Sequence, residues 1–354
     1  MAKYGYEFEA LSPYIRVRKP PDNVTFHQVG SLLISPTSHL IRRQALHGEF
    51  LIRGLIKAKK LLKQKNIDIV HHMLPAVFNY TFSPLALPVG GLRQPFVFGP
   101  LSAHYYERPI SEKILLPLTS RLHRRTVQKS RRIITVTNQV KNLYTTWVNE
   151  EKVSVVPFGV DTDLFKPAQT TEMHKEIEIL YAGSLYALKG VPFLIQAIAY
   201  VRKNKTKANL TIVGEGTQKN ALIALTKALQ IDKHVKFEGF VPNSDMPKYY
   251  NRCDIFCFPT LGEPFGKAVI EAMACRKPVI ATKVGGNAEI IQDGVNGILV
   301  PPANSEALAA EIIRLVNDAQ ERRRIGGMAR EAAINRFSWD KIAEKYHHLY
   351  SELL

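Results

Sequence analysis

Two glutamates, Glu263 and Glu271, have the spacing and the surroundings in this sequence that best fit ligand chemistry. Glu263 lies in a loop marked by glycine and proline, just after the apolar run 253–259, and residues 267–276 have the pattern of a helix. Residues 264–266 then form the helix start, where backbone N–H groups and the positive end of the helix dipole suit an anion such as a diphosphate. A carboxylate beside them suits the hydroxyls of a sugar or ribose, because it accepts short, strong hydrogen bonds. Two glutamates at this spacing more often form a solvated helix face, but the surrounding glycines and proline favour a site.

The elements that must position these residues follow from length and pattern. A chain of 354 residues fits about two domains, each large enough for its own core. The second half alternates short β-rich runs with helical segments, which predicts βαβ units and a parallel sheet. The runs are 178–183, 210–214, 235–239, 254–258, 278–282 and 297–300. The first half repeats the pattern at 24–29, 68–71, 95–98, 132–136 and 153–157. Two doubly wound domains joined near residues 161–167 explain both halves, and such sheets bind ligands at the carboxyl ends of their strands.

The last segment of the chain has the pattern of an amphipathic helix. Ser338 is a plausible N-cap, and an apolar stripe follows it. The stripe consists of Trp339, Ile342, Ala343, Tyr346, Leu349, Tyr350 and Leu353. We favour a helix that crosses back to the first domain over one that packs on its own domain.

The charge of the chain is high and uneven. The formal net charge is +17, and residues 1–167 contribute +13 of it, from 24 Lys and Arg against 11 Asp and Glu. Two basic stretches, residues 42–65 and 121–132, have helical patterns. They form either a solvated surface or one that attracts an anionic membrane or a phosphorylated acceptor, at about 1 kcal/mol per basic residue. No basic motif interleaved with aromatic residues accompanies the charge, so we do not expect a nucleic-acid partner.

Composition excludes other classes of protein. No apolar run approaches the roughly 20 residues of a transmembrane helix, and the first residues lack the apolar region of a signal peptide. Cys253, Cys257 and Cys275 lie in apolar surroundings and are expected to be reduced core residues, not a disulfide or metal site. We expect a cytoplasmic protein, with a peripheral place at the inner membrane face left open.

Taken in order along the chain, the motifs resemble those of the retaining family-4 glycosyltransferases of the GT-B fold. The resemblance covers roughly residues 66–354 and is most specific across 178–302. Its motifs are Tyr181-Ala-Gly-Ser-Leu185 with Lys189-Gly190, then 212–216, 237–242, 263–274, 285–291 and 294–302, with 155–165 matching the domain junction.

The resemblance implies roles for individual residues. Glu263 would hold hydroxyls of the donor sugar, Glu271 the ribose hydroxyls and Lys189 the diphosphate, while the 237–242 turn would contact the base through its backbone. The implied donor-binding set is Gly183, Ser184, Lys189, Gly214, Val241, Pro264, Phe265, Gly266, Lys267 and Glu271. The implied catalytic set is Glu263, Lys189 and His104. A cation at the leaving diphosphate stabilises the charge that develops there, so we expect no metal and no other cofactor. Asp161-Thr-Asp163 reads as part of the junction, not as a metal-binding pair.

Some positions depart from the family pattern. Ser184 stands where an arginine is usual, so a cation is missing or is supplied elsewhere, with Lys267 as the candidate. Arg276 stands where glycine is common, which weakens a helix C-cap. Leu101 occupies the usual place of a histidine near the reacting sugar; His104 could replace it, although a lone histidine is more often structural or solvated.

The start of the chain departs most. The family opens with a strand, a Gly-Gly loop and a helix, whereas residues 1–23 show no such strand and no glycine pair. We expect residues 1–22 to be irregular and mobile, and the first sheet to lack one or two strands. The first domain is then shortened, either naturally or because the chain is a fragment.

The fold class predicted is therefore α/β, GT-B, with two Rossmann-like parallel-sheet domains facing a cleft. The predicted divisions are an acceptor-side domain at 1–166, a nucleotide-sugar domain at 167–336 and the returning helix at 337–354. The predicted function is metal-independent, retaining transfer of a sugar from a nucleoside diphosphate to a glycan, lipid or phosphorylated acceptor. Two alternatives stay open: a donor-binding pseudoenzyme acting as a membrane-associated binding module, and a GT-B sugar-nucleotide epimerase.

Overall fold

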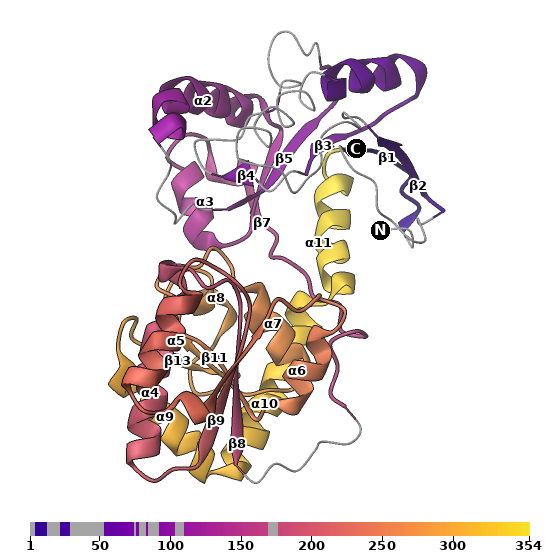
Figure 1. Cartoon of the computed structure of the whole chain (residues 1–354). Coiled ribbons are helices and arrows are strands. Elements are labelled where there is room, and N and C mark those ends of the chain that lie inside the picture. The colour runs from indigo at the N-terminus through magenta and orange to yellow at the C-terminus, as the bar shows by residue number, and fades with distance from the viewer. Residues whose placement is uncertain are drawn as a thin grey trace.

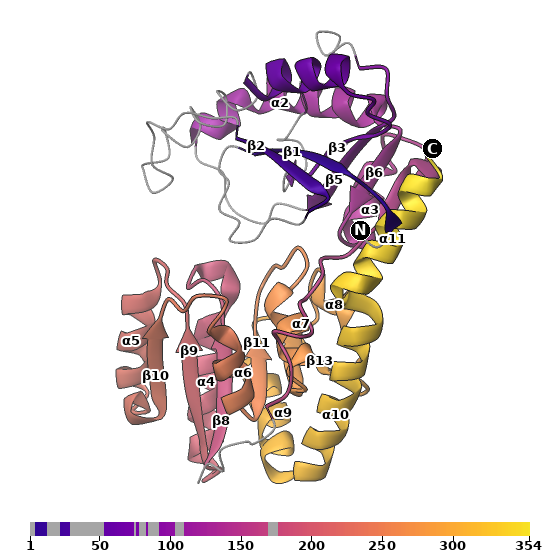
Figure 2. The same cartoon turned by 90° about the vertical axis from the view of Figure 1, so that its right-hand side faces the viewer.

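The computed structural model has two α/β domains, one above the other, joined by two crossings of the chain (Figure 1). It describes residues 4–12, 22–28, 53–73, 76–77, 83, 92–102, 110–168 and 176–354. The carboxyl ends of the strands in the second domain point toward the first domain (Figure 2). That is where ligands of doubly wound sheets bind.

The second domain is built on a six-stranded parallel sheet with the order β10-β9-β8-β11-β12-β13. Its strands are β8 (Ile177–Ala182), β9 (Ala208–Val213), β10 (Val235–Gly239), β11 (Ile255–Phe258), β12 (Val279–Thr282) and β13 (Ile298–Val300). The helices on one face are α4 (Val191–Lys203), α5 (Lys219–Ala228) and α9 (Ser305–Asn317), and those on the other are α6 (Met246–Arg252), α7 (Lys267–Ala274) and α10 (Ala319–Ala332). All six predicted strands are confirmed. Their order reverses between β8 and β11, which makes this edge the switch point of the fold.

The first domain contains a five-stranded parallel sheet with the order β3-β5-β6-β7, and β4 pairs with β5. Its strands are β3 (Val70–His72), β4 (Ala76–Val77), β5 (Phe96–Ser102), β6 (Arg132–Thr135) and β7 (Val153–Val155). Its helices are residues 53–64, α2 (Ile110–Lys129) and α3 (Asn138–Tyr144). The strands predicted from residue 68 onward are confirmed. The basic stretch 121–132 is helical only to Lys129, because Arg132 begins β6.

The expectation for the start of the chain was wrong in one respect. Residues Phe8–Ser12 form strand β1, which pairs in parallel with β2 (Val24–Gln28) in a separate two-stranded sheet. The register is set from Phe8 opposite Val24 to Ser12 opposite Gln28. A strand therefore does precede residue 23. Residues 13–21, which the same expectation covered, lie outside the described part of the chain.

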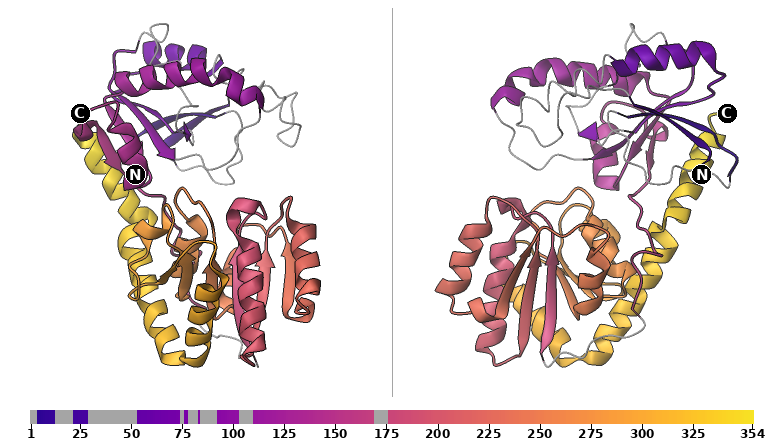
Figure 3. Two further views of the ribbon diagram at one scale, coloured as in Figure 1. Left: turned by 90° about the vertical axis from the view of Figure 1, so that its left-hand side faces the viewer. Right: turned by 45° about the vertical axis from the view of Figure 1, so that its right-hand side comes forward.

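The first sheet needs a cover on each face, and the C-terminal helix supplies one of them. Along β5 the side chains alternate, so that Phe96 and Phe98 pack with α2 and α3, while Val97 faces the opposite side. Helix α11 (Trp339–Ser351) covers that opposite side with Ile342, Leu349 and Tyr350. The predicted return of the last helix to the first domain is confirmed (Figure 3).

A histidine in β3 fixes this helix to the sheet. His71 Nδ1 lies 2.5 Å from the Tyr350 hydroxyl, and Nε2 lies 3.1 Å from the carbonyl oxygen of Gly99. Burial lowers the pKa of His71 to about 4, so its ring is neutral at physiological pH. A neutral ring fits both contacts when Nε2–H donates to Gly99 and Nδ1 accepts from Tyr350.

The three cysteines are buried and free, as expected. None of the helices in the described ranges combines the length and the apolar character needed to cross a bilayer.

Candidate functional site

Three glycines lie at the carboxyl ends of neighbouring strands, where the site was predicted. Gly183, Gly214 and Gly239 follow or end β8, β9 and β10. The Gly214 N–H donates to the carbonyl of Gly239 (2.7 Å), and a Cβ added to Gly214 would lie 1.8 Å from the carbonyl oxygen of Gly183. Gly214 has φ +140 and Gly239 φ +77, conformations that side chains disfavour. The three strand ends therefore present closely spaced backbone, with Ser184 and Val241 in the adjoining loops.

A second loop brings Lys189 to the site. Lys189 ends a short 3₁₀ turn, and Gly190 after it has φ +64. A Cβ on Gly190 would lie 2.0 Å from the carbonyl oxygen of Pro259, so only glycine fits there. The loop is also bonded to the next one, because Leu261 N–H donates to the carbonyl of Leu188 (2.7 Å).

This packing places Lys189 against Glu263. Lys189 Nζ lies 2.7 Å from Glu263 Oε2, and the two residues are 8% and 9% exposed. Lys189 Nζ also lies 5.7 Å from the centre of the Phe258 ring. The predicted diphosphate-binding cation and the predicted sugar-binding acid are thus one buried ion pair in this structure.

Glu263 also occupies the helix start that follows it. Its Oε1 accepts from the N–H groups of Phe265 (3.4 Å) and Gly266 (3.2 Å). Gly266, with φ +100, is the N-cap of α7. Two of the amides expected to face an anion are therefore bonded to the Glu263 carboxylate here, and Lys267, at the first position of the helix, is exposed.

The second glutamate is oriented by a residue that sequence reasoning missed. The Tyr250 hydroxyl donates to Glu271 Oε2 (2.9 Å), and Tyr250 is fully buried. Burial raises the pKa of Glu271, while the hydrogen bond from Tyr250 and the charge of Lys267 lower it. Tyr250 lies in α6, and no local pattern marks it as a partner of α7.

A short helix, α8 (Asn287–Ile290), connects this site to the first domain. Gly286 N–H donates to the carbonyl of Glu263 (3.0 Å). Glu289 accepts from the backbone N–H groups of Asn138 (2.8 Å) and Gln139 (2.9 Å) in α3. The sequence motif 285–291 contained Glu289 but suggested no role for it.

His104 and the Asp161-Thr-Asp163 segment are the remaining residues that the sequence singled out. His104 lies outside the described residues. Asp161 Oδ1 accepts from the N–H groups of Asp163 (3.0 Å) and Leu164 (2.9 Å), as expected of a turn at the junction. Within the described ranges, no three His, Cys, Asp or Glu side chains gather as a metal site requires.

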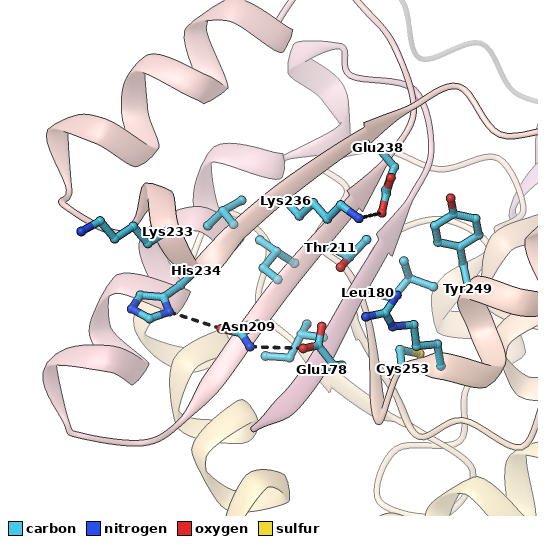
Figure 4. Close-up of a pocket in the computed structure, with 14 residues that line it drawn as sticks. Glu178, Leu180, Asn209, Thr211, Lys233, His234, Lys236, Glu238, Tyr249 and Cys253 are labelled. Carbon is cyan, nitrogen blue, oxygen red and sulfur yellow. Dashed lines mark hydrogen bonds and ion pairs between the residues drawn. The ribbon is translucent and has the colours of Figure 1, made fainter. Parts of the chain in front are cut away.

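A separate pocket of about 400 Å³ lies on a face of the second sheet, along β8, β9 and β10 and beside α6 (Figure 4). Its floor is polar: Asn209 donates to Glu178 (3.2 Å), His234 contacts Asn209 (3.3 Å) and Lys236 pairs with Glu238 (2.6 Å). It shares no residue with the loops around Glu263. Its side chains bond to one another, as expected for a solvated sheet face.

Comparison with known proteins gives two family matches in tandem. A model described as Glycosyltransferase Family 4 matches residues 8–164, and one described as Glycosyl transferases group 1 matches residues 163–332. A D-inositol 3-phosphate glycosyltransferase of Segniliparus rotundus is 34% identical over 205 residues, which are 55% of this chain and 45% of that protein. The chain spans about half the length of the curated relatives it matches.

Solved structures share the fold across the chain. A glycosyltransferase of Rickettsia africae has a TM-score of 0.75 at 22% identity, covering 99% of this chain and 91% of that one. HepE of Anabaena in complex with UDP-glucose has a TM-score of 0.68 at 20% identity, covering 98% and 99%. Both are likenesses of fold.

Proposed function

Because this chain belongs to the family-4, group-1 glycosyltransferases and has their GT-B fold, we propose that it moves a sugar from a nucleoside-diphosphate donor to an acceptor, with retention at the anomeric carbon. The observation that carries the proposal is the buried pair of Lys189 Nζ and Glu263 Oε2 at the carboxyl ends of the sheet. One cation and one carboxylate side by side match the two parts of a sugar diphosphate.

In the proposed reaction, the bond between the anomeric carbon and the diphosphate oxygen breaks, and the diphosphate takes the bonding pair. Lys189 stabilises that developing charge. Glu263 holds hydroxyls of the sugar, and the acceptor oxygen attacks from the face that the diphosphate leaves, passing its proton to the departing diphosphate oxygen. Lys267, exposed at the start of α7, supplies the second cation that Ser184 does not.

Glu271 is proposed to hold the ribose. Tyr250 occupies one of its oxygens, Oε2. The other oxygen is then available to a ribose hydroxyl. The backbone at Val241, which follows the left-handed turn at Gly239, is proposed to contact the base.

The curated relatives favour an enzyme over a donor-binding pseudoenzyme, because those with a named activity include glycosyltransferases and a glycogen synthase. An epimerase is disfavoured because the family matches are to glycosyltransferases. UDP-glucose, which HepE binds, is the donor to test first.

The test is a titration of UDP-, GDP- and ADP-sugars into the protein, followed by transfer assays with candidate acceptors and by NMR of the product anomer. We expect saturable binding of one donor class and a product with the anomeric configuration of the donor. Glu271→Ala should weaken donor binding about 10- to 100-fold, since it removes charge-assisted hydrogen bonds. Glu263→Gln should mainly lower kcat. Glu306→Ala, an exposed change in the first turn of α9, is the matched control.

An inverted product would refute the retaining mechanism. Absence of binding to every nucleoside-diphosphate sugar would refute the donor assignment.

The basic first domain favours an anionic partner, proposed to be a membrane surface that presents the acceptor. The helix of residues 53–64 and α2 both lie on the side of the first domain away from the second (Figure 3). They expose Arg53, Lys60, Lys63, Arg121, Arg124, Arg125 and Lys129. Each helix also exposes an apolar side chain, Ile56 at 64% and Leu118 at 58%. Basic residues with exposed apolar side chains suit an anionic bilayer surface.

A further inference from the structure

Helix α8 is bonded at its start to the loop that carries Glu263. Gly286 N–H donates to the Glu263 carbonyl oxygen (3.0 Å). A Cβ added to Gly285 would lie 1.9 Å from that same oxygen, and one added to Gly286 would lie 2.3 Å from Phe265. The two glycines therefore let α8 pack directly on the backbone of the loop, and a shift of the loop must shift the helix.

The other end of α8 is bonded to the first domain through Glu289. Its Oε2 accepts from the backbone N–H of Asn138 (2.8 Å) and from Asn138 Nδ2 (3.0 Å), and its Oε1 accepts from the N–H of Gln139 (2.9 Å). Asn138 and Gln139 are the first residues of α3, whose dipole places its positive end at the carboxylate. Thr137, the N-cap of α3, bonds to Val140 instead, so Glu289 satisfies amides that the cap does not reach.

A third contact fixes the carbonyl end of α8. Arg336 donates to the carbonyl oxygens of Glu289 (2.8 Å) and Ile290 (3.1 Å). Arg336 lies in the π-helical segment Ala333–Phe337, just before α11 returns to the first domain. With both ends held, this single turn of helix is a short, stiff connection between Glu263 and α3.

We propose that Glu289 is a positioning residue, which holds the acceptor-side domain in register with the donor loop through its hydrogen bonds to α3. The proposal rests on the proposed function, in which the acceptor must meet the donor sugar across the two domains. Glu289 touches no reacting atom in it. Transfer to an acceptor should depend on Glu289, whereas donor binding and attack by water should not, because only transfer needs both domains aligned.

The kinetic test compares Glu289→Ala with Glu306→Ala, a loss of the same charge on α9. For Glu289→Ala we expect kcat for transfer to fall roughly 10- to 100-fold, as a misaligned reactant does. Donor Kd by calorimetry and donor hydrolysis without acceptor should change less than about twofold, which is within the spread of a distant surface change. Asn138→Ala removes only the side-chain bond and should give a smaller loss of transfer.

The structural test does not need activity. Spin labels at Lys129→Cys in α2 and Lys227→Cys in α5 report the distance between the domains, since both positions are exposed and the native cysteines are buried. We expect the distance distribution to broaden in Glu289→Ala and to stay narrow in Glu306→Ala. If the wild-type chain transfers no sugar, the proposed function fails, and this measurement still decides whether Glu289 aligns the domains.

Two results would overturn the proposal. One is an unchanged distance distribution in Glu289→Ala, whatever its rates. The other is a parallel loss of transfer, hydrolysis and donor binding, which would mean that the change damages the donor loop itself.

Discussion

Lys189 Nζ and Glu263 Oε2 lie 2.7 Å apart, and both side chains are almost completely removed from solvent. They come from two loops at the ends of β8 and β11, which the glycine at position 190 allows to touch. A buried ion pair is costly to desolvate, so it is stable only while each charge keeps its partner. A donor that binds between Lys189 and Glu263 must therefore supply a new partner for each of the two charges.

The Lys189–Glu263 ion pair predicts that removing one charge destabilises the protein more than removing both. Lys189→Met should lower the free energy of unfolding by about 3 kcal/mol, because it leaves Glu263 buried without its cation. The double variant Lys189→Met, Glu263→Gln should recover at least about half of that loss, since it removes both charges. Urea unfolding of the two variants measures the difference. Equal stability of the single and double variants would contradict the prediction.

A substitution at Arg276, just after the C-terminal end of α7, is predicted to stabilise the protein. Arg276 has φ +61, a left-handed conformation in which a Cβ is strained. Arg276→Gly should raise the free energy of unfolding by roughly 0.5–1 kcal/mol, the relief of strain less the entropy of glycine. Arg276→Ala keeps the Cβ and is the control, which should show no such gain in thermal unfolding.

The contact of His71 with Tyr350 predicts a pH dependence of stability. Burial lowers the pKa of His71 from 6.5 to about 4, so the unfolded chain takes up the proton before the folded chain does. The stability that His71 contributes is therefore complete above pH 6.5 and is lost as pH falls from 6.5 toward 4, by at most about 1.4 kcal/mol per pH unit.

The measurement is urea unfolding at pH 7.5 and pH 5, compared with His71→Gln, whose side chain does not titrate. The wild type should lose about 2 kcal/mol more than the variant over this range. Parallel losses would mean that other groups set the pH dependence.

The basic helices predict salt-sensitive membrane binding. Binding to anionic liposomes should fall steeply as salt rises, because the screening length shrinks to about 8 Å at physiological ionic strength. Changing Arg53, Lys57, Lys60 and Lys63 together to Gln should remove most of the binding. The same change in charge at Lys203, Lys207, Lys227 and Lys233 of the second domain is the control. Equal binding to neutral and anionic vesicles would show that the charge only solvates the surface.

The proposed mechanism predicts that chelation of divalent metals leaves transfer nearly unchanged. Lys189 provides the positive charge that a metal would otherwise supply at the diphosphate. The measurement is the transfer rate with and without EDTA, with added Mg²⁺ or Mn²⁺ as the control. Loss of activity with EDTA and its return with metal would refute this part of the proposal.

Local sequence patterns were enough to predict most of the strands and helices. The β-rich runs of the second half, the helix that begins after Gly266 and the amphipathic end of the chain are all periodic over a few residues, so propensity and hydrophobic spacing suffice to find them. The strained position at Arg276 was also visible, because a helix end that lacks glycine is a local feature. Strand β1 was missed since Phe8-Glu-Ala-Leu-Ser12 is short, and it is stabilised by pairing with β2.

The tertiary structure alone decided which of these residues meet. The contacts of Lys189 with Glu263, Tyr250 with Glu271 and Glu289 with Asn138 join residues 74, 21 and 151 positions apart. Such pairs leave no periodic pattern in the sequence, because they depend on which strand ends lie side by side and on how the two domains pack. The sequence indicated the two acids and the cation by residue type, but the fold determined the partner of each. Hydrogen bonds and ion pairs require atoms within about 3 Å of one another, and only the fold brings these atoms that close.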